Sequence, residues 1–222
     1  MKTNSNSYTL IYASVIVVIV AFLLAFTNIA LKSRQERNIE LDTKKQILSA
    51  LNIRDVKDAE TEYDKYVKMD MLLQPDGSLL KNDGKFCSNY SDEISKNRLH
   101  IFSCSVNGQT KYVFPLYGAG LWGAIWGYVA INEDRNTVYG AYFSHQSETP
   151  GLGAEIASLK FQDEFKNMKV AKNGEIALSV AKYGKVTDKN YEVDGISGGT
   201  ITSKGVDAMI KKCLGAYKSF FH

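Results

Sequence analysis

Apolar residues dominate the chain from residue 10 to residue 31, and no charged side chain lies among them. A helix of that length extends about 33 Å, which is enough to cross the hydrocarbon core of a bilayer. A cleaved signal peptide is the alternative, but its apolar region is usually shorter, and Asn28-Ile29-Ala30 is a poor cleavage site. The pattern therefore predicts an uncleaved transmembrane helix over residues 10–31, preceded by a short tail of residues 1–9.

Basic residues follow this apolar stretch rather than precede it. Lys2 stands alone before it, and five basic side chains come soon after it, namely Lys32, Arg34, Arg37, Lys44 and Lys45. Taken literally, the positive-inside rule keeps the rest of the chain in the cytoplasm, although the rule is weak for large domains. Residues 32–52 place Ile47, Leu48 and Leu51 on one helical face, which predicts a stalk helix that continues from the membrane.

The remaining residues, 53–222, are long enough to form one well-buried core. Turn signals at 75–77 and 82–84 separate short apolar runs around 69–73 and 79–80, which predicts hairpin strands. Stronger strand signals follow, because four runs are rich in β-branched and aromatic residues with glycines between them: 100–106, 111–117, 125–131 and 137–143. These runs predict a twisted, mostly antiparallel sheet.

Helical periodicity returns towards the C-terminus. We expect a helix over 155–168, a further strand over 175–183 and a last helix after residue 203. The last helix has one continuous apolar stripe, made by Val206, Met209, Ile210, Cys213, Leu214 and Tyr217. The predicted fold class is therefore α+β, with a single N-terminal transmembrane helix and one soluble domain whose sheet is flanked by helices.

Composition narrows the possible functions. The formal net charge is only +3, and no basic run has the footprint of a nucleic-acid-binding surface. Cys87, Cys104 and Cys213 lack the spacing of a zinc or iron–sulfur site, so no metal centre is expected. Cys87 and Cys104 could pair in an oxidising compartment, but buried free thiols are an equally good interpretation.

Residues 118–123 formally match the G-x-G-x-x-G dinucleotide fingerprint. The fingerprint requires a helix to begin at its third glycine, whereas a β-like run follows Gly123, so we interpret the match as false. The loop instead offers Trp122, with Trp126 nearby, for packing on a flat aromatic ring, and core packing of the two rings is the alternative.

Residues 145–155 form a second unusual stretch, with a histidine and a glutamate three positions apart. Thr149-Pro150-Gly151 breaks any helix there, which disfavours a metal site. We expect a strand end and a Pro-Gly loop whose backbone amides, from Gly151 to Ala154, face a polar cradle.

Residues 194–203 form a small-residue turn that leads into the last helix. Glycines expose consecutive amide N–H groups, and the positive end of the helix dipole lies beside them, so the turn is a candidate anion site. Thr200 offers a hydroxyl to a phosphate there. The structural alternative is an ordinary helix entry with Thr202 or Ser203 as N-cap.

Taken in order, these segments resemble the C subunit of the bacterial sodium-translocating NADH:quinone oxidoreductase. The resemblance rests on four motifs and the N-terminal anchor, and it covers essentially the whole chain: 115–123, 127–130, 145–155 and 194–203. In that family FMN is attached covalently, through its phosphate, to the last threonine of an Asp-x-x-Ser/Thr-Gly-Ala-Thr motif by a flavin transferase that uses FAD. This chain has Gly199 where the family usually has alanine.

The resemblance implies Thr200 as the covalent FMN residue and 53–222 as the FMN-binding domain. The other implied cofactor-binding residues are Ser197, Gly198, Gly199, Ile201, Thr202, Trp122, His145, Glu148, Thr149, Gly151, Leu152 and Gly153. No catalytic acid, base or nucleophile is expected, because the cofactor performs the redox step.

The implied role is an electron relay between an iron–sulfur centre and another flavin, inactive without the other subunits of the membrane complex. The family also implies the bacterial inner membrane, with the flavin domain in the periplasm and the tail in the cytoplasm. Two alternatives remain: the G subunit of the Rnf ferredoxin:NAD oxidoreductase, and a non-redox assembly protein with an unmodified Thr200.

Overall fold

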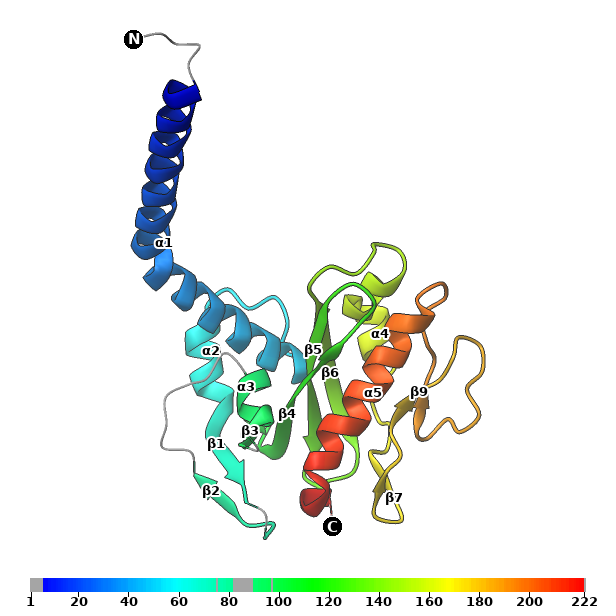
Figure 1. The fold of residues 1–222 in the computed structure, drawn as a ribbon. Coiled ribbons are helices and arrows are strands. Elements are labelled where there is room, and N and C mark those ends of the chain that lie inside the picture. The colour runs from blue at the N-terminus through cyan, green and yellow to red at the C-terminus, as the bar shows by residue number, and fades with distance from the viewer. Residues whose placement is uncertain (1–5, 75, 82–89, 97, 222) are drawn as a thin grey trace. The chain divides into compact units, whose positions relative to one another are not determined.

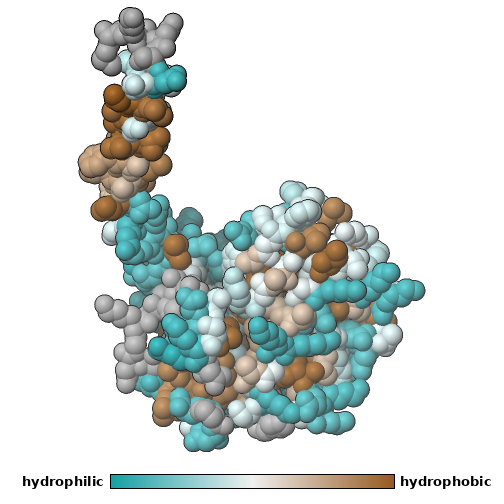
Figure 2. Space-filling view, in the orientation of Figure 1, coloured by the Kyte–Doolittle hydropathy of each residue, from teal (hydrophilic) through white to brown (hydrophobic). Residues whose placement is uncertain are grey.

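The computed structural model describes residues 6–74, 76–81, 90–96 and 98–221, and Cys87 lies outside them. The chain divides between residues 41 and 42 into two compact units. Its first helix, α1, runs without a break from Asn6 to Ala50. The part of α1 in the first unit is long and apolar enough to cross a membrane by length and composition, and Figure 2 shows apolar side chains gathered along it.

The end of α1 belongs to the second unit. Asn52 has a positive φ of 60°, and the amides of Asn52 and Ile53 donate to the carbonyls of Ser49 and Leu48. This bond pattern is the Schellman motif, which ends a helix at a residue in the left-handed conformation. Ile47, Leu48 and Leu51 are fully buried, so the predicted apolar face of the stalk packs in the domain.

A six-stranded antiparallel sheet forms the centre of the domain, in the order β2-β1-β3-β4-β5-β6. Its strands are β1 (Val67–Leu73), β2 (Leu79–Lys81), β3 (Leu99–Val106), β4 (Gln109–Ala119), β5 (Ala124–Asn132) and β6 (Val138–His145). Each predicted strand of the sheet is confirmed to within a few residues. The predicted α+β class is therefore confirmed.

Helix α5 (Thr200–Ala216) covers one face of the sheet, as Figure 1 shows. A short 3-10 helix, η1 (Gly153–Ala157), α4 (Leu159–Asp163) and the C-terminal η2 (Lys218–Phe221) complete that face. The opposite face is covered by the end of α1, α2 (Ala59–Tyr66) and α3 (Tyr90–Ser95). Between α4 and α5 lie two short strand pairs, β7 (Ala171–Lys172) with β8 (Glu175–Ile176) and β9 (Ser179–Val180) with β10 (Glu192–Val193).

Two of the predicted elements are wrong. The expected helix over 155–168 breaks at Ser158, which has extended backbone angles and accepts a hydrogen bond from the Phe161 amide. That side chain caps α4 and thereby separates it from η1. The expected strand over 175–183 consists only of β8 and β9.

Helix α5 packs unusually close to β4. A β-carbon on Gly118 would lie 2.8 Å from Met209 Cβ, and one on Gly205 would lie 2.5 Å from the Ala119 carbonyl oxygen. The Cys213 thiol donates to the Tyr117 carbonyl at 3.4 Å. The whole predicted apolar stripe of α5 is buried, so the helix start is fixed on the sheet.

Candidate functional site

The turn before α5 is closed by backbone hydrogen bonding. The Gly199 amide donates to the Ile196 carbonyl at 3.0 Å, and Gly198 has a φ of +74°. A positive φ at the third position of a four-residue turn is typical of type II, and glycine adopts it without a steric penalty. The Ile196 amide donates to Ser203 Oγ at 2.9 Å, which holds the turn against the helix.

Helix α5 begins at Thr200, and its N-cap is Gly199, which has no side chain to cap the helix. The alternative that Thr202 or Ser203 is the N-cap is therefore wrong, because Ser203 lies inside the helix and receives the Ile196 amide. The first amides of a helix have no partner within it. An uncapped start leaves these donors, together with the positive end of the dipole, available beside the Thr200 hydroxyl.

Residues 120–123 are a four-residue connection between β4 and β5, closed by a bond from the Gly120 amide to the Gly123 carbonyl. Strand β5 starts at Ala124, directly after Gly123. A strand in the place of a helix agrees with the interpretation of the dinucleotide match as false. Ser147 Oγ donates to the Trp122 carbonyl at 2.8 Å and ties this loop to the segment after β6.

Glu148 lies between the loop and the helix and is only 4% exposed. Its Oε1 accepts from the Trp122 amide at 2.8 Å, and its Oε2 accepts from Thr202 Oγ1 at 2.6 Å. Burial raises the pKa of Glu148, but the hydrogen bonds from Thr202 and from backbone amides outweigh burial and hold the pKa below its ordinary value. The carboxylate is therefore ionised at neutral pH.

These three segments enclose a cavity of about 430 Å³, which we call the threonine cavity. Its lining residues are Leu121, Trp122, Glu148, Thr149, Leu152, Gly153, Gly198, Gly199, Thr200, Ile201 and Thr202. Four of them are large apolar residues that are 43–65% exposed, namely Leu121, Trp122, Leu152 and Ile201. Such exposure is unusual for large apolar side chains grouped together, and it is typical of ligand sites.

The structure places most of the predicted site residues around this cavity. The exceptions are Ser197, Gly151 and His145. His145 ends β6, and its Nδ1 accepts from the Glu148 amide at 3.1 Å. Trp126 packs on the other face of the sheet, where its Nε1 donates to Gln46 at 3.0 Å, so Trp122 is the indole at the cavity.

Leu121 lines the cavity but was not among the predicted site residues. It precedes Trp122 in the same loop, and its apolar character in a glycine-rich turn was the available signal.

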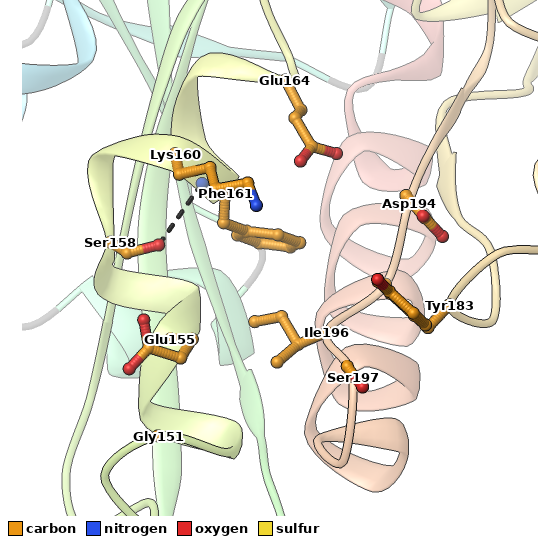
Figure 3. Close-up of a pocket in the computed structure, with 11 residues that line it drawn as sticks. Gly151, Glu155, Ser158, Lys160, Phe161, Glu164, Tyr183, Asp194, Ile196 and Ser197 are labelled. Atoms are coloured by element: carbon orange, nitrogen blue, oxygen red, sulfur yellow. Dashed lines mark hydrogen bonds between the residues drawn. The ribbon is translucent and has the colours of Figure 1, made fainter.

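A second cavity of about 390 Å³, the carboxylate cavity, is lined by Ser197, Gly151 and residues absent from the predicted site. These additional residues are Glu155, Ser158, Lys160, Phe161, Glu164, Tyr183, Asp194, Gly195 and Ile196. In Figure 3 the side chains of Phe161, from α4, and Ile196, from the turn, point toward each other. Three carboxylates and one ammonium group surround this apolar centre.

Comparisons with known proteins identify the domain that contains both cavities. A model of the FMN-binding domain matches residues 120–215, a range that includes the lining residues of both cavities. The C subunit of the Na⁺-translocating NADH-quinone reductase of Haemophilus ducreyi is 30% identical, over 96% of this chain and 91% of its own length.

Two solved structures are also similar. The crystal structure of the C subunit of the same reductase from Parabacteroides distasonis is 42% identical, with a TM-score of 0.80, and the match covers 86% of this chain and 96% of that one. NqrC of Shewanella oneidensis, 24% identical over 83% of this chain and 97% of its own, shares the fold with a TM-score of 0.69. The chain therefore belongs to the family of the C subunit of the Na⁺-translocating NADH-quinone reductase and carries an FMN-binding domain.

Proposed function

We propose that the chain is an electron-relay subunit that carries FMN esterified through its phosphate to Thr200. The observation that carries the proposal is the position of Thr200. It is the first residue of an uncapped helix, and it lines a cavity with exposed apolar walls. A hydroxyl, a set of free amides and an apolar surface are what a phosphate joined to a flat ring requires.

The residues present fit this cofactor. The threonine cavity falls in the size range of small-molecule sites, and because its lining residues include no basic side chain, backbone amides would make the contacts with the phosphate. The phosphodiester charge would be stabilised by the first amides of α5 and by the helix dipole, which is worth about 0.3–1 kcal/mol. An interaction this weak can orient the phosphate but cannot keep FMN on the protein, so the ester bond would keep it there.

FMN, when bound, supplies the reversible uptake and release of electrons. The chain's own residues hold and surround it. We propose that Trp122, Leu121, Leu152 and Ile201 cover the flat ring and keep water from it, while the turn of Ser197, Gly198 and Gly199 positions the phosphate. Four further predicted site residues, Thr149, Gly151, His145 and Gly153, shape the loop on the other side of the cavity.

The wider assembly follows from the family. Relatives of this chain are named as subunits of an NADH-quinone reductase, so we propose that it relays electrons between an iron–sulfur centre and another flavin and is inactive alone. We propose 10–31 as the transmembrane helix, 32–52 as the stalk and 53–222 as the covalent FMN-binding domain. A flavin transferase would attach the cofactor.

The first test is to produce the full chain together with a flavin transferase and compare Thr200→Ala with Thr110→Ala. Thr110 lies on β4 and lines neither cavity. The unaltered chain and Thr110→Ala are expected to show flavin fluorescence that stays with the denatured chain and a mass increase of one FMN less one water. Thr200→Ala should lose both completely while remaining folded. A native chain that carries no covalent flavin would refute the proposal.

A second test concerns orientation. We propose that the domain faces the periplasm and residues 1–9 the cytoplasm, because a large domain can translocate against the charge bias. Protease added to cells with a permeabilised outer membrane should then digest the domain. Protection until the inner membrane is lysed would show the opposite orientation.

A further inference from the structure

Glu148 joins three segments that are far apart in the sequence. It comes from the loop after β6, and it bonds the Trp122 amide in the β4–β5 loop and the Thr202 hydroxyl in the first turn of α5. The threonine cavity is formed by these same three segments. One carboxylate thus connects all the walls of the cavity.

The space around this carboxylate is shaped to hold it. A β-carbon on Gly120 would lie 2.5 Å from Glu148 Oε1. A β-carbon on Gly153 would lie 2.5 Å from Glu148 Oε2 and close against Thr202 Oγ1. The absence of a side chain at these two glycines therefore leaves room for the carboxylate in the position that it occupies.

Both oxygens of Glu148 already accept a bond from the chain, and its side chain is almost fully buried. The bonds that the structure shows for this carboxylate therefore join segments of the chain to one another. Thr202 lies two residues after Thr200 on the same helical turn, so the Glu148–Thr202 bond fixes the loops relative to the attachment residue.

We propose that Glu148 is a positioning residue, whose carboxylate bonds hold the Trp122 loop in register with the Thr200 end of α5 so that the indole lies against the tethered flavin. The part of this proposal that concerns the flavin rests on the proposed function. The hydrogen bonds of Glu148, in contrast, are present in the chain without any flavin. The test of the proposal therefore has one part without flavin and one part with it.

Four substitutions at Glu148 and Thr202 separate the carboxylate bonds from the charge. Glu148→Ala removes both bonds. Glu148→Gln keeps them in a neutral form, because its amide oxygen accepts from the Trp122 amide and its NH₂ donates to Thr202 Oγ1. Thr202→Val removes only the bond to α5, and Thr202→Ser, a conservative control, retains it. Glu133→Gln is the matched control, since Glu133 is exposed in the turn after β5 and lines neither cavity.

In the first part, amide hydrogen exchange is measured at residues 120–123 of the full chain in detergent, produced without a flavin transferase. Glu148→Ala should accelerate exchange of the Trp122 amide at least tenfold. Thr202→Val should accelerate it severalfold, and Glu148→Gln, Thr202→Ser and Glu133→Gln less than twofold. Unchanged exchange in Glu148→Ala would overturn the proposal, and if that variant does not fold, unchanged exchange in Thr202→Val does so.

In the second part, the fluorescence yield of the native, tethered flavin is compared with that of Trp122→Phe. Indole in contact with a flavin quenches its fluorescence by donating an electron. Loss of the carboxylate bonds should therefore raise the yield at least twofold, towards that of Trp122→Phe, in Glu148→Ala and Thr202→Val only. A yield unaffected by these variants while Trp122→Phe raises it would overturn the proposal. A chain without tethered flavin would refute the function, and the exchange measurement would still judge the role of Glu148.

Discussion

The threonine cavity and the carboxylate cavity use the same two loops, residues 151–155 and 194–199, but they present different chemistry. The threonine cavity has exposed apolar walls and a single charged residue, Glu148, whose oxygens are both bonded by the chain. The carboxylate cavity has Glu155, Glu164 and Asp194 around its edge. An anionic phosphate is repelled by such an edge, whereas the uncapped start of α5 attracts it. The comparison supports the proposal that the phosphate binds on the Thr200 side of the shared turn.

The largest expected effect separates two glycines of the shared loop. Gly153→Ala would place a β-carbon against Thr202 Oγ1 and Glu148 Oε2, and overpacking of this kind costs about 1–3 kcal/mol. Gly151→Ala meets nothing within 4 Å, and its cost comes only from a φ of +73°, about 1 kcal/mol. We expect urea unfolding of the full chain to show the larger loss for Gly153→Ala.

Exchange at the Trp122 amide serves as the control for this pair. It should accelerate in Gly153→Ala and stay unchanged in Gly151→Ala, because only the former disturbs Glu148. If Gly153→Ala and Gly151→Ala lost the same stability and showed the same exchange at the Trp122 amide, the close contact between Gly153 and the Glu148 carboxylate would not matter for the threonine cavity.

The two cavities each contain a glutamate, and lowering the pH should change the stability contributions of these two glutamates in opposite directions. Hydrogen bonds from Thr202 and from backbone amides outweigh burial at Glu148 and lower its pKa, so its contribution to stability is present above the ordinary value near 4.5 and is lost as the pH falls through the lower folded value. Partial burial and the nearby Asp194 charge raise the pKa of Glu164, although the residue remains exposed to solvent at the cavity edge. The ionised Glu164 is therefore unfavourable in the folded state, and its effect grows as the pH rises through the folded value.

The measurement is the free energy of unfolding of each Gln variant between pH 3.5 and pH 7. Glu148→Gln should reduce the loss of stability on acidification, and Glu164→Gln should be more stable than the unaltered chain at pH 7 but not at pH 3.5. The same sign for both variants would contradict the assigned environments. Glu133→Gln should follow the unaltered chain throughout.

The sequence predicted the sheet well because its strands carry local signals. Strands β3 to β6 combine β-branched and aromatic residues with glycine turns, and the apolar stripe of α5 is continuous along the helix. The break at Ser158 could not be predicted in this way. Serine at this position is also compatible with a continuous helix, so the sequence alone does not show that Ser158 is the N-cap of α4.

The candidate site shows the same division. Sequence motifs identified the turn, the helix start and the two loops, and the family resemblance implied that these segments together bind FMN. The pairing of Glu148 with Thr202 spans 54 residues of sequence and depends on how closely α5 approaches β4. The carboxylate cavity was missed because its residues come from four segments of the chain, and the two recognised motifs among them, 145–155 and 194–203, had been assigned to the other cavity.

The smallest expected effect concerns Gly199, where the family usually has alanine. Gly199 has a φ of −102°, which alanine adopts without strain, and alanine at such a position gains about 0.4–1 kcal/mol by restricting the unfolded chain. A β-carbon there would lie 3.0 Å from Ile196 Cγ2, a tight contact in a buried side chain. The two effects oppose each other, so Gly199→Ala alone should change the free energy of unfolding by less than about 0.5 kcal/mol. Combined with Ile196→Leu, which removes the Cγ2 methyl from Cβ, the same substitution should become more favourable, while the contacts with the Cβ of residue 196 at 3.2 Å and with the Leu152 carbonyl carbon at 3.3 Å remain. A double-mutant cycle measures this coupling. Additive effects would show that Ile196 is not the reason this chain tolerates glycine beside Thr200.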